Sequence, residues 1–361
     1  MGTAAVKESF GPQVTASDVT FRLPDEDEAL AMVELNQDVQ RPRLGPPFAF
    51  DANRKIWSLR FPRPNADRME YGLHLVHRDG SDEWIPDPAN ERRASGPFGE
   101  RSVVEWPEYV APAWVDRDAP AGSLVEADIP SRTLRAGLKT ILWTAPGHAG
   151  DEPLPLLVAH DGPEYAQLSA LIKLLEVGVH EDRIPALRAA LLAPVHRDQA
   201  YSASAAYSRA LAYEILPEVY RRAPTPHGRS MRVGMGASLG ALALLHLHRT
   251  SPSAFGALFL QSGSFFRMRF DKQESGFVRF RRISRFMGSV LTADGWPHPI
   301  PITMTCGTAE ENLANNHATR DALARQGYDV VLHENRDAHN WIGWRDAFDP
   351  YLLDMLAKAW S

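Results

Sequence analysis

The sequence of 361 residues has one cysteine, no long hydrophobic run and no excess of positive charge, and each absence excludes a class of protein. Cys306 alone cannot form an internal disulfide framework or a cysteine-based zinc site. No apolar stretch approaches the roughly 20 residues that a membrane-spanning helix needs, and the first residues lack the pattern of a secretory signal. A formal net charge of −6 gives no sign of nucleic-acid binding. We therefore expect a soluble, cytoplasmic protein that binds neither nucleic acid nor membranes.

The first third of the chain has the pattern of β structure. The length predicts about two domains at ~150 residues each. Short alternating runs are separated by turn signals, of which Arg78-Asp79-Gly80-Ser81 is the clearest because Asp-Gly accepts the positive φ angles of a tight hairpin. We expect residues 1–112 to form a small immunoglobulin-like β-sandwich. The predicted strands are Val19–Leu23, Leu30–Leu35, Ile56–Phe61, Tyr71–His77 and Ser102–Trp106.

A proline-rich segment, 107–122, tolerates neither helix nor central strand and marks the domain boundary. From residue 123 to 361 apolar strands alternate with helical patterns, which predicts an α/β domain with a largely parallel sheet. The predicted strands are Thr140–Thr144, Leu154–Ala159, Leu187–Leu192, Met231–Gly234, Ala257–Leu260, Ile300–Thr305 and Val330–His333. The predicted helices are Glu164–Leu175, Ala205–Val219, Leu239–His248, Asn312–Gln326 and Trp344–Lys358.

The strongest chemical signal is the run Gly236-Ala237-Ser238-Leu239-Gly240, which follows a short apolar strand and precedes a helix. This is the context of a nucleophile elbow, in which a sharp turn presents the serine at the carboxyl end of a strand. The flanking glycines are expected because strand and helix crowd the turn. The run therefore predicts Ser238 as a catalytic nucleophile, although the short motif alone also occurs by chance.

A serine hydroxyl needs a base, and in α/β-hydrolases the chain order is Ser, then Asp or Glu, then His. His339 lies in a loop between a predicted strand and the last helix, whereas His317 and His333 fall inside predicted elements. The strand at Ile300–Thr305 is followed by two carboxylates. Glu310 is nearer the strand end and is our predicted acid, and Glu311, which suits a helix N-terminus, stays open as the alternative.

An oxyanion hole needs backbone N–H groups. Leu239, immediately after the nucleophile, should supply one. Gly162, in the loop after an early strand, should supply the other because Pro163 has no N–H. His160 precedes the elbow in the chain and fits a role in bracing that loop.

Several further segments occur in a specific order and spacing. They are Val158-Ala-His-Asp-Gly-Pro-Glu-Tyr165, His196-Arg-Asp-Gln-Ala-Tyr201, Tyr213-Glu-Ile-Leu-Pro217, Gln261-Ser-Gly-Ser-Phe-Phe266, Cys306-Gly-Thr-Ala-Glu-Glu-Asn312 and His339-Asn-Trp-Ile-Gly-Trp-Arg345. With the elbow, this set resembles the enterochelin (enterobactin) esterase family, a branch of the α/β-hydrolase esterases related to esterase D and feruloyl esterases. The resemblance covers most of the chain and implies the same three residues, Ser238, Glu310 and His339, as the triad.

The resemblance also implies a substrate, because relatives of this family hydrolyse the ester bonds of cyclic tricatecholate siderophores. It implies no cofactor and no resident metal, since iron arrives with a ferric or free siderophore. One departure is the run Asp337-Ala338-His339-Asn340-Trp341, where Gly-Gly-His-Asp-Trp is expected. The loop before the base is therefore bulkier and more polar than in the family pattern.

A ferric tricatecholate is an anion, and residues 267–285 carry seven positive and two negative side chains, with phenylalanines between them. Arginine suits planar anionic oxygens and stacks on aromatic rings. We expect Phe266, Arg267, Arg269 and Trp341 to contact the substrate. The alternative for this segment is an ordinary amphipathic helix with a solvated basic face.

Two other functions stay open. A feruloyl- or acetyl-type carboxylesterase acting on carbohydrate esters uses the same triad, but such enzymes usually act outside the cell. A non-catalytic siderophore or carbohydrate binder could also be built on a hydrolase fold, although a complete triad in the right order argues against it.

Overall fold

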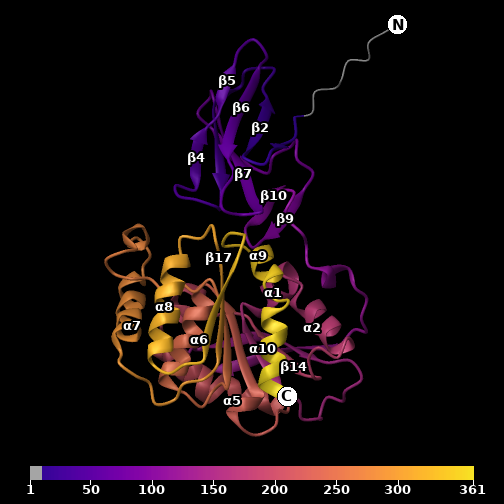
Figure 1. Cartoon of the computed structure of the whole chain (residues 1–361), viewed down its shortest axis with the longest axis vertical. Coiled ribbons are helices and arrows are strands. Elements are labelled where there is room, and N and C mark those ends of the chain that lie inside the picture. Colours follow the sequence, from indigo (N-terminus) through magenta and orange to yellow (C-terminus); the bar gives the residue numbers. More distant parts are fainter. Residues whose placement is uncertain (1–9) are drawn as a thin grey trace. The chain divides into compact units, whose positions relative to one another are not determined.

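The computed structural model describes residues 10–361, and the chain divides into two compact units (Figure 1). The first unit contains the residues up to Val110 together with Gly307–Glu311 and Arg336–Asn340. The second contains Ala111–Cys306, Asn312–Asn335 and Trp341–Ser361. The sequence patterns gave no sign that two short segments from the last fifth of the chain join the first unit.

The first unit consists of two antiparallel sheets that share a core. One sheet has the order β1-β2-β6-β5, and the other has the order β4-β3-β7-β10-β9 with β8 paired to β7. Phe21 on β2 lies 4.7 Å from Tyr71 on β7, and both rings are fully buried. The strands are β1 Gln13–Val14, β2 Asp18–Pro24, β3 Leu30–Gln37, β4 Leu44–Pro47, β5 Ala49–Asp51, β6 Ile56–Pro62, β7 Arg68–His77, β8 Asp82–Ile85, β9 Arg93–Gly96 and β10 Gly99–Glu105.

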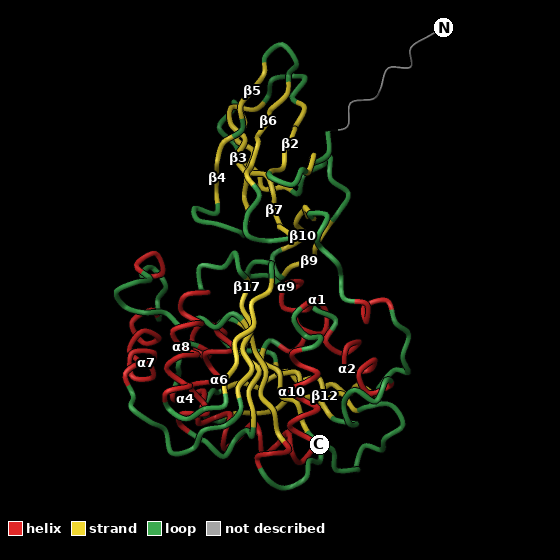
Figure 2. The backbone as a smooth tube through the Cα atoms, in the orientation of Figure 1, coloured by secondary structure: helices red, strands yellow, loops and turns green. Residues whose placement is uncertain are grey.

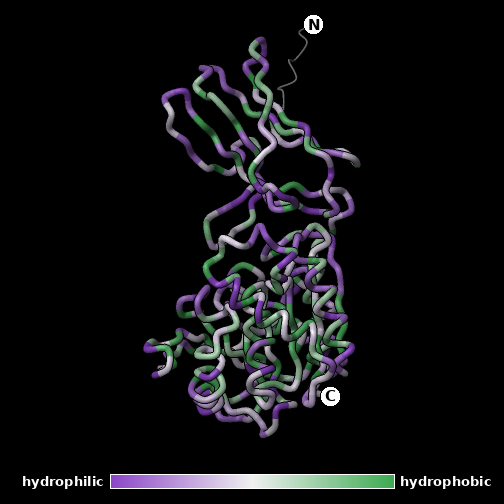
Figure 3. Tube along the Cα trace, turned by 90° about the vertical axis from the view of Figure 1, so that its left-hand side faces the viewer, coloured by the Kyte–Doolittle hydropathy of each residue, from purple (hydrophilic) through white to green (hydrophobic). Residues whose placement is uncertain are grey.

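All five strands predicted for this region are present, as β2, β3, β6, β7 and β10. The Asp79-Gly80 hairpin is also confirmed: Gly80 has φ +88° and the His77 N–H donates to the Ser81 carbonyl at 2.8 Å, between the paired strands β7 and β8. The hydropathy changes repeatedly along these strands (Figure 3). This is expected because residues that face the core alternate with residues that face solvent. The short strands β1, β4, β5, β8 and β9 were not predicted, because they hold too few residues to show a period.

The second unit is built on an eight-stranded sheet with helices on both faces (Figure 2). The order is β11-β12-β14-β13-β15-β16-β17-β18, in which β11–β12 and β12–β14 are antiparallel and the pairs from β14 to β17 are parallel. This confirms a mixed α/β unit with a mostly parallel sheet. The strands are β11 Ser123–Ser131, β12 Ala136–Thr144, β13 Leu156–His160, β14 Arg188–Leu192, β15 Arg232–Ala237, β16 Ala257–Gln261, β17 Ile302–Gly307 and β18 Val330–Asn335.

Alternate residues of the central strands enter two separate cores. On β13, Leu156 and Val158 pack with α5, α6 and α7, whereas Leu157 and Ala159 pack with α1, α2 and α10. The period of two along a strand thus builds three layers with the sheet in the middle. The helices are α1 Gly162–Leu168, α2 Leu171–His180, α3 Arg197–Tyr201, α4 Ala205–Ala210, α5 Leu216–Arg222, α6 Leu239–Thr250, α7 Phe280–Thr292, α8 Leu313–Arg325, α9 Trp341–Asp346 and α10 Tyr351–Trp360.

Three predicted helices are each interrupted. The segment predicted as Glu164–Leu175 breaks between α1 and α2, where Ala170 takes a left-handed φ of +51°. The segment predicted as Ala205–Val219 passes through a π-helical turn before α5, whose Pro217 has no N–H to donate backwards. The segment predicted to begin at Trp344 starts earlier, as α9, and resumes as α10 after Pro350.

Candidate active site

Ser238 occupies the sharp turn between β15 and α6 with a backbone that side chains rarely adopt, φ +55° and ψ −121°. Its N–H donates to the Gln261 carbonyl at 2.9 Å, and its carbonyl accepts from Ser264 N at 3.1 Å, which holds the turn. A Cβ on Gly236 would lie 2.8 Å from the carbonyl carbon of Gly240, so the turn requires glycine there. Such a strained residue, fixed by its surroundings, is typical of a nucleophile elbow.

The side chain of Ser238 is partly exposed, whereas its chain neighbours Ala237 and Leu239 are buried. Its Oγ lies 3.0 Å from the Oγ of Ser264, which sits in the loop after β16. Sequence reasoning assigned no role to Ser264, and the only signal was its place in the Gln261–Phe266 segment. The structure therefore presents the predicted nucleophile with a hydroxyl partner.

The two predicted oxyanion donors begin helices whose first-turn N–H groups have no acceptor within their own helix. Leu239 is the first residue of α6 and Gly162 the first of α1. A Cβ on Gly162 would lie 2.3 Å from the Cα of Leu191 on β14, so only glycine fits there. The loop before Gly162 packs on the elbow, because a Cβ at Gly240 would lie 3.3 Å from the Cβ of His160.

His160 braces this loop from a fully buried position. Its Nδ1–H donates to the Gly240 carbonyl at 3.2 Å, and its Nε2 accepts from the Tyr207 hydroxyl at 3.0 Å. Its ring also stacks on Tyr201, with centroids 4.7 Å apart. Burial lowers the pKa of His160 to about 4, so the imidazole is neutral at pH 7 and fixed in one tautomer. This is the bracing role that the sequence indicated.

We predict that stability falls steeply between pH 7 and pH 4 because three histidines are buried in neutral form. Burial lowers the pKa values of His160, His246 and His248 to about 4 each, below the ~6.5 of the unfolded chain. The native state then binds fewer protons than the unfolded state, and each histidine costs up to about 3 kcal/mol as pH falls through this window. The carboxyls of Asp38, Glu70, Asp87, Glu164 and Asp337, whose pKa values burial raises, act oppositely and offset part of this loss.

Thermal unfolding midpoints measured from pH 8 to pH 4 check this prediction. His148 pairs with Glu152 at a position that is not buried, so His148→Gln should leave the pH dependence as it is in the wild type. A midpoint that does not change between pH 7 and pH 5 contradicts the prediction.

Glu310 and His339 form a hydrogen-bonded pair in the first unit. The His339 Nδ1 lies 2.7 Å from Glu310 Oε2, and Glu310 Oε1 accepts from the Gly307 N–H at 2.8 Å. The carboxylate side chain is 1% exposed and the imidazole 23%. Because the carboxylate only accepts, Nδ1 carries the hydrogen and Nε2 is left able to take a proton. This is the relation that a catalytic acid and base require.

Glu311 faces a different partner. Its carboxylate accepts from the Nε of Arg41 at 2.8 Å, in a two-point ion pair within the first unit. Burial alone raises the pKa of Glu311, but the bond from Arg41 and the charges of Arg41 and Arg43 together outweigh it, and the net pKa is lowered. Of the two candidate acids, Glu310 is therefore the one bonded to the imidazole.

The predicted substrate-binding residues lie in varied surroundings. Phe266 is buried, with its ring 6.1 Å from that of Phe280. The Arg267 guanidinium lies over the Phe270 ring at 4.4 Å, while Arg269 is exposed. Trp341, the first residue of α9, is partly buried in edge contact with a neighbouring aromatic ring.

The rest of the basic segment forms α7, an amphipathic helix. Ile283 and Met287 are buried, and Arg281 and Arg285 are exposed, as the alternative for this segment predicted. Arg282 donates to the carbonyls of the chain near Gln199 and is held by them. Only the stretch before α7 therefore remains as a candidate basic surface for an anionic substrate.

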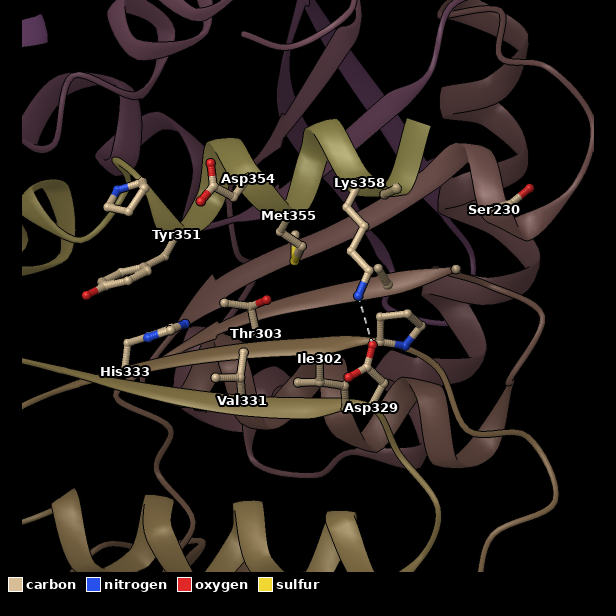
Figure 4. A pocket seen from close by; sticks show the side chains of 15 residues that line it. Ser230, Ile302, Thr303, Asp329, Val331, His333, Tyr351, Asp354, Met355 and Lys358 are labelled. Atoms are coloured by element: carbon tan, nitrogen blue, oxygen red, sulfur yellow. Dashed lines mark hydrogen bonds and ion pairs between the residues drawn. The ribbon is translucent and has the colours of Figure 1, made fainter. Parts of the chain in front are cut away.

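A cavity of about 490 Å³ lies elsewhere in the second unit, between α10 and strands β16 to β18 (Figure 4). Its lining includes Ala257 and Ile302, the first residues of β16 and β17, and the ion pair of Lys358 with Asp329 at 3.1 Å. Ligands of such sheets bind beyond the carboxyl ends of the strands, where Ser238 follows β15. None of the predicted site residues lines this cavity.

Within residues 10–361, no group of three or more His, Cys, Asp or Glu side chains is arranged to hold a metal ion. Over the same range, no helix is both long and apolar enough to cross a membrane.

No protein-family model matches the chain. The chain is 25% identical over 301 residues to the iron(III) enterobactin esterase of Escherichia coli K12, covering 82% of this chain and 72% of that protein. It is 26% identical over 216 residues to the same-named protein of Dickeya dadantii, covering 56% and 48%. The chain resembles the enterobactin esterases. The resemblance predicted from the sequence is thereby confirmed.

Solved structures give the fold. An enterobactin esterase from Shigella flexneri, crystallised in the presence of enterobactin, is 21% identical with a TM-score of 0.75, covering 98% of this chain and 97% of that one. A ferulic acid esterase is 14% identical with a TM-score of 0.57, covering 67% of this chain and 99% of that one. The first likeness includes nearly all of both chains, so this chain has the fold of these esterases.

Proposed function

We propose that the protein is a serine esterase that hydrolyses the trilactone ester bonds of a catecholate siderophore such as enterobactin. One observation carries the proposal: an elbow serine, Ser238, occurs in the same chain as a histidine whose Nδ1 is bonded to a buried carboxylate, Glu310. The esterases that the chain resembles are named for enterobactin, which supports this choice of substrate. We infer that Ser238, His339 and Glu310 act together as a catalytic triad.

In the proposed reaction, Ser238 Oγ attacks the ester carbonyl carbon while His339 Nε2 takes its proton. Glu310 holds the imidazole and stabilises the imidazolium that forms. The N–H groups of Leu239 and Gly162 stabilise the negative oxygen of the tetrahedral intermediate. His339 then gives its proton to the leaving alcohol, and water, activated by the same imidazole, hydrolyses the acyl-enzyme and restores Ser238.

We assign substrate binding to the segment around Phe266, Arg267 and Arg269, with Trp341 beside the base. The exposed Arg269 offers a positive charge to a catecholate anion, and the Arg267–Phe270 stack holds a second guanidinium on an aromatic ring. The iron of a ferric siderophore is part of the substrate, so the reaction needs no cofactor. We place this reaction in the cytoplasm, after uptake of the siderophore.

The proposal includes a domain assignment. Residues 1–112 form an immunoglobulin-like β-sandwich and residues 123–361 an α/β-hydrolase domain. Two antiparallel sheets with a shared core support the former, and a mostly parallel sheet with an elbow serine after β15 supports the latter.

A substrate panel tests the proposal. Enterobactin, its linear trimer, bacillibactin and methyl ferulate are compared by kcat/KM, with products separated by chromatography. We expect at least one trilactone to exceed methyl ferulate by about 100-fold, because contacts to several catecholates supply about 2.7 kcal/mol of additional transition-state binding. Faster turnover of methyl ferulate than of every trilactone favours a feruloyl-type esterase instead. A wild-type protein that binds siderophore but hydrolyses no ester favours a binder.

A further inference from the structure

The loops that carry Glu310 and His339 are embedded in the first unit. Ala338, the residue before His339, is 1% exposed and belongs to the hydrophobic core of the two antiparallel sheets, and Ala309 packs against that core. The Thr308 hydroxyl donates to the Asn65 carbonyl, and the Asp67 N–H donates to the Arg336 carbonyl at 2.8 Å. Both loops are therefore bonded to the segment between β6 and β7, more than 200 residues earlier in the chain.

A buried guanidinium contacts the histidine loop directly. Arg68, the first residue of β7, is 3% exposed. Its Nη2 lies 2.9 Å from Glu70 Oε1, and its Nη1 lies 3.4 Å from Asn340 Oδ1 and 3.9 Å from Asp337 Oδ2. Asn340 and Asp337 lie on either side of His339, so one charged group contacts the loop both before and after the base.

Asp337 and Asn340 are also bonded to each other. Asp337 Oδ1 accepts from the Asn340 Nδ2 at 2.8 Å and from the Ala338 N–H at 2.7 Å. Asn340 Nδ2 further donates to Asp38 Oδ2 at 3.0 Å. Side-chain hydrogen bonds thus link the residues before and after His339 to each other. Arg68 is the positively charged group beside them.

The cluster has more carboxyl groups than guanidinium groups. Asp38, Glu70 and Asp337 face Arg68 and Arg101, and Arg101 donates to the Glu70 carbonyl at 3.2 Å. Burial raises the pKa of all three carboxyls, and that of Asp337 to about 7. Without Arg68 two buried acids would lose their nearest cation, so the loop conformation depends on this residue.

We propose that Arg68 is a positioning residue for the catalytic base, acting on His339 through Asp337 and Asn340. The inference rests on the proposed function, and it makes the first unit part of the catalytic apparatus. A base held by a fixed loop keeps Nε2 in line for proton transfer, and a displacement of about 1 Å costs up to about 100-fold in rate.

The test compares Arg68→Met, Asp337→Asn and the double variant with the wild type, using a small chromogenic ester and thermal unfolding. Each single variant is expected to lower kcat about 10- to 100-fold with KM changed less than about 3-fold. Because both act through one contact, the double variant should lower kcat no further than either single one. Removing both charges should at the same time recover part of the unfolding midpoint lost in Arg68→Met.

Arg60→Met is the matched control. Arg60 pairs with the buried Asp18 in the other sheet of the first unit, and neither residue belongs to the loops that carry the base and the acid. This variant should have the kcat of the wild type, even if its unfolding midpoint is lower. If Arg68→Met does not fold, Arg68→Lys replaces it, since one ammonium cannot bridge Glu70, Asp337 and Asn340 and kcat should still fall.

A folded Arg68 variant with kcat within 2-fold of the wild type overturns the inference. The inference is also overturned if the double variant loses kcat by the product of the two single effects. It is overturned as well if the double variant regains kcat together with its unfolding midpoint. In each of these cases the wild-type esterase activity stands. Failure of the proposed function itself is recognised separately, because the wild type would then hydrolyse no ester or would prefer methyl ferulate to every trilactone.

Discussion

Replacing Ser238 by alanine is expected to lower kcat by about 10³- to 10⁶-fold, the range that loss of a catalytic serine produces. The Oγ at the elbow is the only protein atom in the proposed mechanism that forms a covalent bond to the carbonyl carbon of the substrate. The Cβ and the backbone turn remain, so the variant should fold with an unfolding midpoint close to that of the wild type. Siderophore affinity, measured by quenching of the intrinsic fluorescence, should change less than about 3-fold.

The control for this variant is Ser230→Ala. Ser230 lies just before β15, and Ser238 follows the other end of that strand. Ser230 lines the cavity beside α10, and no residue given a catalytic role lines that cavity. The control should retain wild-type turnover. Full activity in Ser238→Ala would exclude an acyl-enzyme on this residue.

Replacing Glu310 by glutamine is expected to lower kcat by about 10³- to 10⁴-fold. The carboxylate accepts the hydrogen of His339 Nδ1 at 2.7 Å, and an amide of the same shape can present N–H there instead. The imidazole then takes the wrong tautomer, with Nε2 protonated and unable to act as a base. The effect should appear in kcat with both an activated ester and the siderophore, since proton removal from the serine is common to both.

Glu311→Gln separates the two candidate acids. Its partner is Arg41, so the variant should lose an ion pair of which Arg41 is 48% exposed. Such a pair contributes about 1 kcal/mol or less to stability. We expect turnover to stay within about 3-fold of the wild type. The opposite ranking, with Glu311→Gln the inactive variant, would reassign the acid.

The candidate site could be predicted from the sequence because its chemistry follows strand ends. Ser238 carries glycine neighbours that only a tight turn requires, and Glu310 and His339 each come shortly after an apolar strand. The order of such strands along the chain brings residues to one edge of a parallel sheet, whatever the remaining contacts are. This local information favoured Glu310 but left Glu311 open, and the structure shows that Glu310 is the one bonded to His339 Nδ1, at 2.7 Å.

The attachment of the two loops to the first unit could not be predicted. Arg68 and Asn340 are 272 positions apart, and neither has a pattern that points to the other. In the sequence, Asp337 and Ala338 stood out only because the family pattern has two glycines at these positions. The structure gives the reason, since Ala338 fills a core and Asp337 accepts bonds on both sides of the base.

The helix breaks were missed for a different reason. A helical period continues on both sides of Ala170, and an alanine normally favours a helix. Ala170 nevertheless takes a left-handed conformation before α2 and packs partly buried against the core, which a single sequence does not reveal. Likewise, the sequence gives the net charge of residues 267–285. It does not reveal that the Arg282 guanidinium donates to two backbone carbonyls of a distant segment.

The division of the first unit between the two ends of the chain has a consequence for biosynthesis. Although its strands are translated first, its core lacks Ala338 and its buried Arg68 lacks Asp337 until translation reaches these residues, more than 200 positions after β10, the last strand of the unit. The nascent first unit therefore has an unfinished core and an unbalanced charge until the loop between β18 and α9 has been made. The segment that carries His339 is therefore also the segment that completes the core and the charge balance of the first unit.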